Sequence, residues 1–173
     1  MADKAMFKKI SLAVLIATSL VAGHAMARSS DRNQPIDISA NQGVMEQDES
    51  RPSVVTGNVV ITQGSLVINA SKGVVTLRGG EPVRVVLTGG PVRLQQTMDN
   101  GQPLTVNASQ ADYNLATDIV TLTGNVRISQ PSGNLSAPSA VYNMGTGRFE
   151  SQGSSSGRVK MRFVPKNQRG ATS

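Results

Sequence analysis

Residues 55–75, VTGNVVITQGSLVINASKGVV, decide the fold of this chain. The stretch is rich in Val, Ile and Thr, and Gln63-Gly64-Ser65 interrupts it, so it predicts two strands folded back on each other. Parts of it recur. TGNV returns at residues 123–126, and INASKGVV (68–75) has relatives at 38–45 (ISANQGVM), 106–113 (VNASQADY) and 135–142 (LSAPSAVY). A repeated hairpin predicts a duplicated chain whose layers of strands stack on one another.

The rest of the chain after residue 27 continues this pattern. Val, Ile and Thr are abundant, Gly and Asn punctuate them, and no long window shows a helical apolar stripe. The pattern predicts an all-β fold of about 13–16 short antiparallel strands, as in a sandwich, barrel or jelly roll. Small residues recur at one position of the repeat, where they let strands pass close together or leave room inside: Ala40, Ala70, Ala108 and Ala137.

The first 27 residues have the features of a secretory signal peptide. Three lysines precede residues 10–21, an apolar run of 12 residues that is too short to span a bilayer. Ala25-Met26-Ala27 then provides the small residues that a signal peptidase requires. We expect cleavage after Ala27, with an N-terminal membrane anchor as the alternative.

The predicted mature chain is mildly basic and lacks the side chains of many enzymes. Removing three Lys and one Asp from 17 basic and 11 acidic residues leaves 14 and 10, a net charge of +4. This charge suits a partner that carries phosphate or carboxylate. The chain has no Cys, and its one His, His24, leaves with the signal peptide. We therefore expect no enzyme, no metal site and no cofactor, since triads, thiol nucleophiles and His-based zinc sites are excluded.

Two groups of charged residues are candidate sites. Glu46, Asp48 and Glu49 lack the spacing of a calcium loop, and a solvated turn explains them better. Three arginines near the middle turns could hold phosphates at the rim of an apolar groove, because guanidinium groups pair with phosphate: Arg78, Arg84 and Arg93. The alternative is that they are plain outward-facing charges.

The predicted interior leaves two interpretations open. Few aromatic residues are available, and the inward positions are mostly Val, Ile, Leu and Ala. The interior is either thin and filled, or lined with aliphatic side chains and incompletely filled, so that it takes an apolar ligand. The first and last strands are unprotected edges, which favours strand addition to a partner or another copy. Alternatively, Arg32, Lys160, Arg162 and the C-terminal tail act against such pairing.

Four segments together resemble a known family: QPIDI (34–38), VVTGNVVITQGSLVINA (54–70), TDIVTLTGNVRISQ (117–130) and RVKMRFVPKNQ (158–168). They are similar to the OstA-like domain family of lipopolysaccharide-transport proteins over nearly all of the chain after residue 27. The resemblance implies one twisted β-jellyroll, partly open along one side. The expected layout is a signal peptide at 1–27, the OstA-like domain at 28–164 and a flexible basic tail at 165–173.

The resemblance also implies a function in the periplasm of a Gram-negative bacterium. The domain would carry lipopolysaccharide from the inner to the outer membrane, with the acyl chains in an apolar groove and the sugar head outside. A non-catalytic scaffolding β-solenoid that binds other envelope proteins is the alternative. By position, the side chains expected to contact acyl chains are Ile36, Ile38, Val59, Ile61, Leu66 and Ile68 in the first half and Tyr113, Leu115, Ile128, Leu135 and Phe149 in the second.

The resemblance further implies that such domains join edge to edge. The first strand, with Ile36 and Ile38, would dock on an LptC-like partner anchored in the inner membrane. The last strand would dock on an outer-membrane LptD-like partner or on another copy, giving a head-to-tail homo-oligomer; its docking residues would be Val159, Met161 and Phe163.

Overall fold

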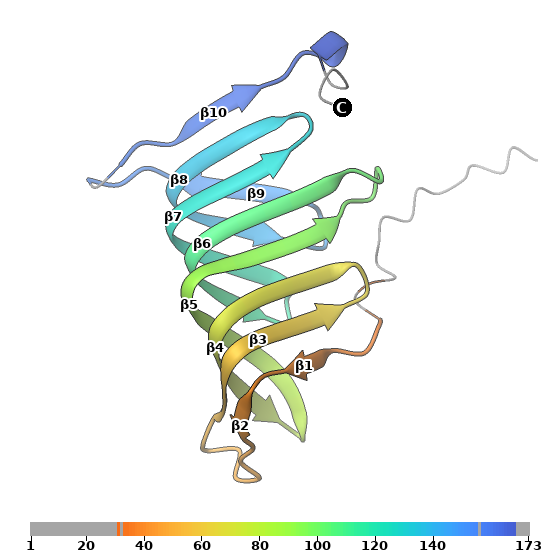
Figure 1. Ribbon diagram of the computed structural model, residues 1–173, viewed down its shortest axis with the longest axis vertical. Helices are drawn as coiled ribbons and strands as arrows, with labels where there is room; N and C mark the ends of the chain where they lie inside the picture. The colour runs from red at the N-terminus through yellow and green to blue at the C-terminus, as the bar shows by residue number, and fades with distance from the viewer. Residues whose placement is uncertain (1–30, 32, 156, 169–173) are drawn as a thin grey trace, which may run out of the picture.

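A computed structural model of the chain describes residues 31, 33–155 and 157–168. The described residues form one antiparallel sheet of ten strands (Figure 1). The strands pair in the order β1-β3-β4-β5-β6-β7-β8-β10, while β2 also pairs with β3 and β9 with β8. Their bounds are β1 Asp37–Ser39, β2 Gln42–Val44, β3 Ser53–Gln63, β4 Leu66–Arg78, β5 Glu81–Thr97, β6 Pro103–Asn114, β7 Ile119–Gln130, β8 Gly133–Asn143, β9 Arg148–Gln152 and β10 Lys160–Phe163.

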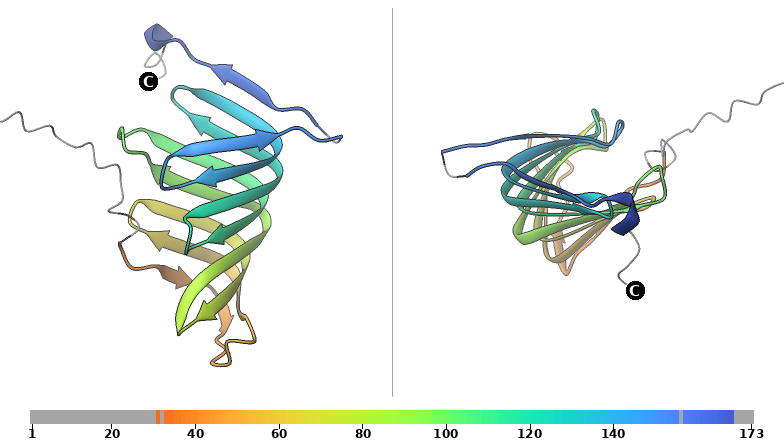
Figure 2. Two further views of the ribbon diagram at one scale, coloured as in Figure 1. Left: turned by 180° about the vertical axis from the view of Figure 1, so that it is seen from behind. Right: turned by 90° about the horizontal axis from the view of Figure 1, so that it is seen from above.

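The long strands bend near their middle, so that one sheet folds into two layers. Pairing shifts register at the bend in β3, β4, β5, β6 and β7, and it continues on both sides. Seen from above, the strands form a V (Figure 2). We call the two arms the β2–β9 layer (42–44, 53–56, 72–75, 85–88, 110–114, 119–123, 139–143 and 148–152) and the β1–β10 layer (37–39, 59–63, 66–70, 92–97, 103–108, 126–130, 133–137 and 160–163).

The repeated TGNV motif forms the bend. Gly124 and Asn125 have φ angles of +78° and +50°, and Gly57 and Asn58 have +77° and +47°. Gly and Asn tolerate this left-handed backbone better than other residues. The bend is also tight, because a Cβ added to Gly124 would lie 2.7 Å from the Cβ of Ser109. The motif is therefore a corner that joins the two layers.

The predicted all-β, antiparallel and partly open fold is confirmed, but the predicted strand count is wrong. The described residues contain ten strands in place of the expected 13–16, and β3 to β8 run for 11 to 17 residues. The sequence pattern favoured separate strands on either side of Ala70-Ser71, Ala108-Ser109 and Gly124. In the structure the chain turns through these residues and remains in the same strand.

Two other expectations concern the ends of the chain. The proposed signal peptide at 1–27 lies outside the described residues. In the proposed tail, Lys166–Gln168 forms a short 3-10 helix, and residues 169–173 lie outside the described part. No helix among the described residues is long and apolar enough to cross a membrane.

The core lies between the two layers. Alternate residues of each strand point inward, as the two-residue period of a strand requires. Val59, Ile61, Leu66 and Ile68 are at most 1% exposed, and they meet Leu87 and other residues of the opposite layer in one cluster. Burying each of these large side chains contributes about 1.5–3 kcal/mol. Packing between the layers therefore holds the V together.

Two tyrosine–glutamine pairs join the layers at the strand ends farthest from the bend. The Tyr113 hydroxyl donates to Oε1 of Gln63 over 3.1 Å, and the Tyr142 hydroxyl donates to Oε1 of Gln96 over 3.0 Å. All four side chains are buried, so each bond satisfies polar groups that would otherwise be costly to bury. We call these pairs the Tyr–Gln bridges.

Replacing Gly124 with Ala should destabilise the protein more than replacing Gly101 with Ala. Both glycines have nearly the same φ, +78° and +76°, and this backbone costs Ala about 1–2 kcal/mol. Only at Gly124 does the new methyl group meet Ser109, and such overpacking adds about 1–3 kcal/mol. Urea unfolding followed by circular dichroism measures the difference. Adding Ser109→Gly should restore part of the loss in Gly124→Ala; equal losses at the two glycines would contradict the tight corner.

The Tyr142–Gln96 bridge predicts a loss of stability in alkali. Burial, with a smaller effect of Asp99, raises the pKa of Tyr142 from 10.0 to about 12. The folded state then holds the proton more tightly than the unfolded state, so stability is complete below pH 10 and falls as the pH rises toward 12, by about 2–3 kcal/mol.

Tyr142→Phe removes this titration and is the matched comparison. The variant should be less stable than the parent at pH 9, by about 1 kcal/mol for the lost hydrogen bond, yet lose less stability between pH 9 and 11.5. Denaturant unfolding at the two pH values tests this. Parallel pH profiles for the two proteins would show that Tyr142 is not shielded in the fold.

Candidate ligand-binding site

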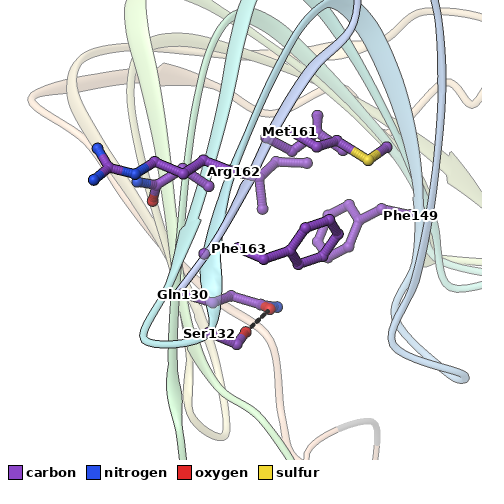
Figure 3. A pocket seen from close by; sticks show the side chains of 10 residues that line it. Gln130, Ser132, Phe149, Met161, Arg162 and Phe163 are labelled. Carbon is purple, nitrogen blue, oxygen red and sulfur yellow. Dashed lines mark hydrogen bonds between the residues drawn. The ribbon is translucent and has the colours of Figure 1, made fainter. Parts of the chain in front are cut away.

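An apolar cavity of about 150 Å³ lies at the β10 end of the fold (Figure 3). Residues of β7, β8, β9 and β10 surround it, so both layers contribute to its wall. The cavity continues the apolar core toward the last strand. Its lining residues are Ile128, Leu135, Phe149, Met161 and Phe163, with the more polar Gln130, Ser132, Gly133, Asn134 and Arg162.

Strand register directs β10 side chains toward this cavity. Met161 lies opposite Leu135, and Phe163 lies opposite Gly133. Residues directly opposite in an antiparallel pair share a face, and Leu135 packs against the core. Because β10 is the last strand of the described sheet, Met161 is 59% exposed and Phe163 is 78% exposed. The core thus ends in an uncovered apolar surface.

The aromatic side of the cavity comes from the other layer. The ring of Phe149 stacks on that of Tyr142, with 4.1 Å between the centroids and 6° between the planes. On the opposite side, β8 and β10 approach closely at Gly133, where an added Cβ would lie 2.0 Å from the carbonyl oxygen of Arg162. Gly133 therefore lets β10 close over the cavity.

A few polar groups mark the edge of the cavity. Ser132 Oγ donates to Gln130 Oε1 over 3.2 Å, and Gln130 Nε2 contacts Met98 Sδ at 3.1 Å. The Ser132 carbonyl accepts from the Val164 amide over 2.9 Å, which fixes the chain just after β10. An apolar pocket with a short polar edge is the usual form of a site for an apolar ligand.

The eleven side chains expected to contact acyl chains all belong to the core between the layers. Six of them are buried: Val59, Ile61, Leu66, Ile68, Tyr113 and Ile128. The other five are partly buried and pack against the core: Ile36, Ile38, Leu115, Leu135 and Phe149. Of the eleven, only Ile128, Leu135 and Phe149 line the cavity. The buried wall of the first half is packed against neighbouring side chains. Contact with acyl chains there stays a prediction, and it requires the layers to separate.

The three arginines considered for a phosphate rim do not line the cavity. Arg84 pairs with Asp112 on the outer surface, where Nε donates to Oδ1 over 2.8 Å. The hydrogen bond and the charge of Asp112 raise the pKa of Arg84. Arg93 is exposed on the β1–β10 layer, where it pairs with Asn69 and Asn107 of the neighbouring strands, and Arg78 ends β4 beside a turn. Arg162 is the one cation among the described residues that line the cavity, and its side chain points away from Phe163 (Figure 3).

The acidic segment before β3 forms a turn. Asp48 accepts from the Ser50 amide over 3.0 Å, and hydrogen bonds from Ser50 lower the pKa of Asp48. Glu49 accepts from the Gly80 amide over 2.8 Å. Within the described residues, no cluster of three or more His, Cys, Asp or Glu side chains is arranged to hold a metal ion.

The residues considered for docking lie at the two ends of the stack. Ile36 and Ile38 pack on the core at the β1 end, and Met161 and Phe163 are uncovered at the β10 end. Sequence reasoning missed a second exposed apolar site at the end of β2, formed by Val44 and Met45. Met45 holds the last position of the repeated segment, which Tyr113 and Tyr142 hold in later copies, and this equivalence could have revealed it.

Comparison with known proteins agrees with the fold. The structure superposes with a TM-score of 0.71 on the solved structure of LptH from Pseudomonas aeruginosa. LptH is described as the LptA homologous periplasmic component of the lipopolysaccharide transport device. The match covers 79% of this chain and 99% of that one at 20% identity, which supports the shared fold.

Sequence comparison identifies the family. The lipopolysaccharide export system protein LptA of Escherichia coli K12 is 36% identical over 95% of this chain and 93% of its own length. LptA of Haemophilus influenzae is 31% identical over 91% and 94%. A family profile described as "LptA/(LptD N-terminal domain) LPS transport protein" matches residues 37–148. The chain therefore belongs to the LptA/LptD N-terminal domain family of lipopolysaccharide transport proteins.

Proposed function

We propose that this protein binds lipopolysaccharide and passes it on within a transport system in the periplasm. The observation that carries the proposal is the uncovered end of the apolar core, where Met161 and Phe163 lie beside the cavity. The names of the LptA relatives support this function. In this proposal the acyl chains contact the inward side chains, and the sugar head stays outside the V.

The proposed transfer of lipid is passive. An acyl chain that moves from one apolar surface to another exchanges similar environments, whereas exposure to water costs about 0.8 kcal/mol per CH₂. A cavity of about 150 Å³ holds a group only about the size of benzene. A longer chain therefore needs the layers to part, or a neighbouring apolar surface to extend the cavity. No step requires a catalytic residue, and the energy for directed movement must come from another protein.

Both ends of the stack support a chain of domains. The β1–β2 end and the β9–β10 end are sheet edges whose backbone groups can pair with another strand. A second copy, an inner-membrane-anchored LptC-like partner or an outer-membrane LptD-like partner would continue the sheet and cover Phe163. In this scheme, the segment 1–27 directs secretion and is removed.

One observation favours a second candidate function, a scaffold that joins envelope proteins without carrying lipid. Ile61 and Leu66 are at most 1% exposed, so the first half of the core has no room for a ligand as it stands. A scaffold would keep that core closed while its edges bind partners. Whether lipid contacts the first half of the core therefore distinguishes the two functions.

Site-specific photo-crosslinking in cells tests lipid binding. A photoreactive residue at Leu135, in the cavity wall, or at Ile38, in the first half, should capture lipopolysaccharide, because both side chains point into the core. The control is Asp37, next to Ile38 and exposed. Capture at Leu135 alone would confine lipid to the β10 end. Silence at both inward positions would reject the lipid-binding function and leave the scaffold.

Head-to-tail assembly predicts a strong effect at the last strand. Phe163→Lys and Val159→Lys should each reduce self-association at least about tenfold, since a buried charge at the edge opposes apolar contact. The matched control is Val141→Lys, a partly exposed position that pairs with Glu150 on the outer surface. Light scattering over a concentration series, without lipid, measures assembly. Equal association of the three variants would rule out β10 as the docking edge.

A further inference from the structure

A second hollow, of about 970 Å³, lies on the outer face of the β1–β10 layer. Its floor is β7 and β8, and its wall is the chain between β9 and β10. At this point residues 153–155 and 157–159 lie outside the sheet, whereas the other strands turn through a short corner. The segment projects away from the layers (Figures 1 and 2). Ser154 and Gly157 exchange backbone hydrogen bonds of 2.9 and 3.1 Å, so the projecting turn is closed on itself.

The hollow is basic. Arg127 of β7, Arg158 of the projecting segment and Lys160 of β10 line it, and no lining residue is Asp or Glu. Among the ion pairs of the described residues, none involves these three side chains. Arg127 lies opposite Ser136, which lies opposite Lys160, so the backbones of Arg127 and Lys160 are two strand spacings apart, about 9–10 Å. Three uncompensated cations around one hollow favour an anionic ligand.

The remaining lining groups restrict the ligand further. Asn125, Asn134 and Ser136 offer amide and hydroxyl groups, which can bond to sugar hydroxyls. Val126 and Ile128 also border the hollow, but their side chains are buried in the core on the other side of the sheet. The described lining residues include no aromatic ring that could stack on a base. The volume of the hollow is far larger than one phosphate requires and lies within the usual range for small-molecule sites.

We propose that this outer hollow binds a phosphorylated saccharide, with the phosphate held by Arg127, Arg158 and Lys160 and the sugar by the neighbouring amide and hydroxyl groups. The guanidinium groups pair with phosphate oxygens in a fixed fork, and the lysine adds a mobile point charge. The site faces away from the acyl-chain cavity and does not depend on lipid entering the core.

Nuclear magnetic resonance titration of the ¹⁵N-labelled chain tests the proposal. Glucose 6-phosphate should shift the amide signals of Asn134, Ser136 and Gly157 in a saturable way, whereas glucose should not. The double variant Arg127→Gln/Lys160→Gln should weaken binding at least about tenfold. The matched control is Arg51→Gln/Lys72→Gln, which removes the same charge from exposed positions outside the hollow. Binding by the control should equal that of the parent chain.

Three results would overturn the site: no saturable shift, equal weakening in both double variants, or equal shifts with inorganic phosphate at the same concentration. Deacylated lipopolysaccharide distinguishes the source of the sugar phosphate. Tighter binding of this probe than of glucose 6-phosphate assigns the hollow to the lipid's head, and equal binding assigns it to free sugar phosphates. Neither probe has acyl chains, so this titration and the photo-crosslinking at Leu135 test different sites. A negative titration would reject the outer hollow alone, and a negative crosslinking result would reject lipid binding in the core alone.

Discussion

The close approach of strands at the bend is the constraint on which the rest of the structure depends. At Gly89, as at Gly124, the backbone is left-handed, and a Cβ would lie 2.4 Å from the Cβ of Ser71. The Ser71 hydroxyl donates to the Gly89 carbonyl over 2.8 Å, which fixes one strand to the next at the corner. Because successive strands bend at the same place, a single sheet encloses its own core. No second sheet has to be supplied.

The same constraint explains why the ends of the stack differ from its sides. Along the sides, each inward residue is covered by the opposite layer and by strands above and below. At β10 one of those neighbours is missing from the described chain, so inward residues such as Phe163 remain exposed although they follow the core pattern. The cavity beside Phe149 thus exists because the stack of strands ends there, and its lining is apolar because it continues the core.

The repeat could be predicted from sequence because it is local. The period-two pattern correctly indicated an all-β fold and placed Val59, Ile61 and Ile68 inward. The corner at Gly124 was mistaken for a strand boundary, since left-handed residues also end strands. Contacts between residues far apart in the chain could not be predicted from the sequence pattern. The pairing of Arg84 with Asp112 joins residues 28 positions apart, and the basic hollow depends on how β8 divides its pairing between β9 and β10.

The stacking of bent strands fixes the length of the protein as well as the shape of its interior. Each layer holds eight strand segments, and neighbouring strands are about 4.8 Å apart, so the stack is about 34 Å long. Its cross-section is set at each bend and does not depend on the number of strands. Adding one hairpin would lengthen the stack by about 10 Å and leave the interior shape unchanged. Length in such a fold is therefore free to evolve by whole hairpins, separately from the shape of the interior.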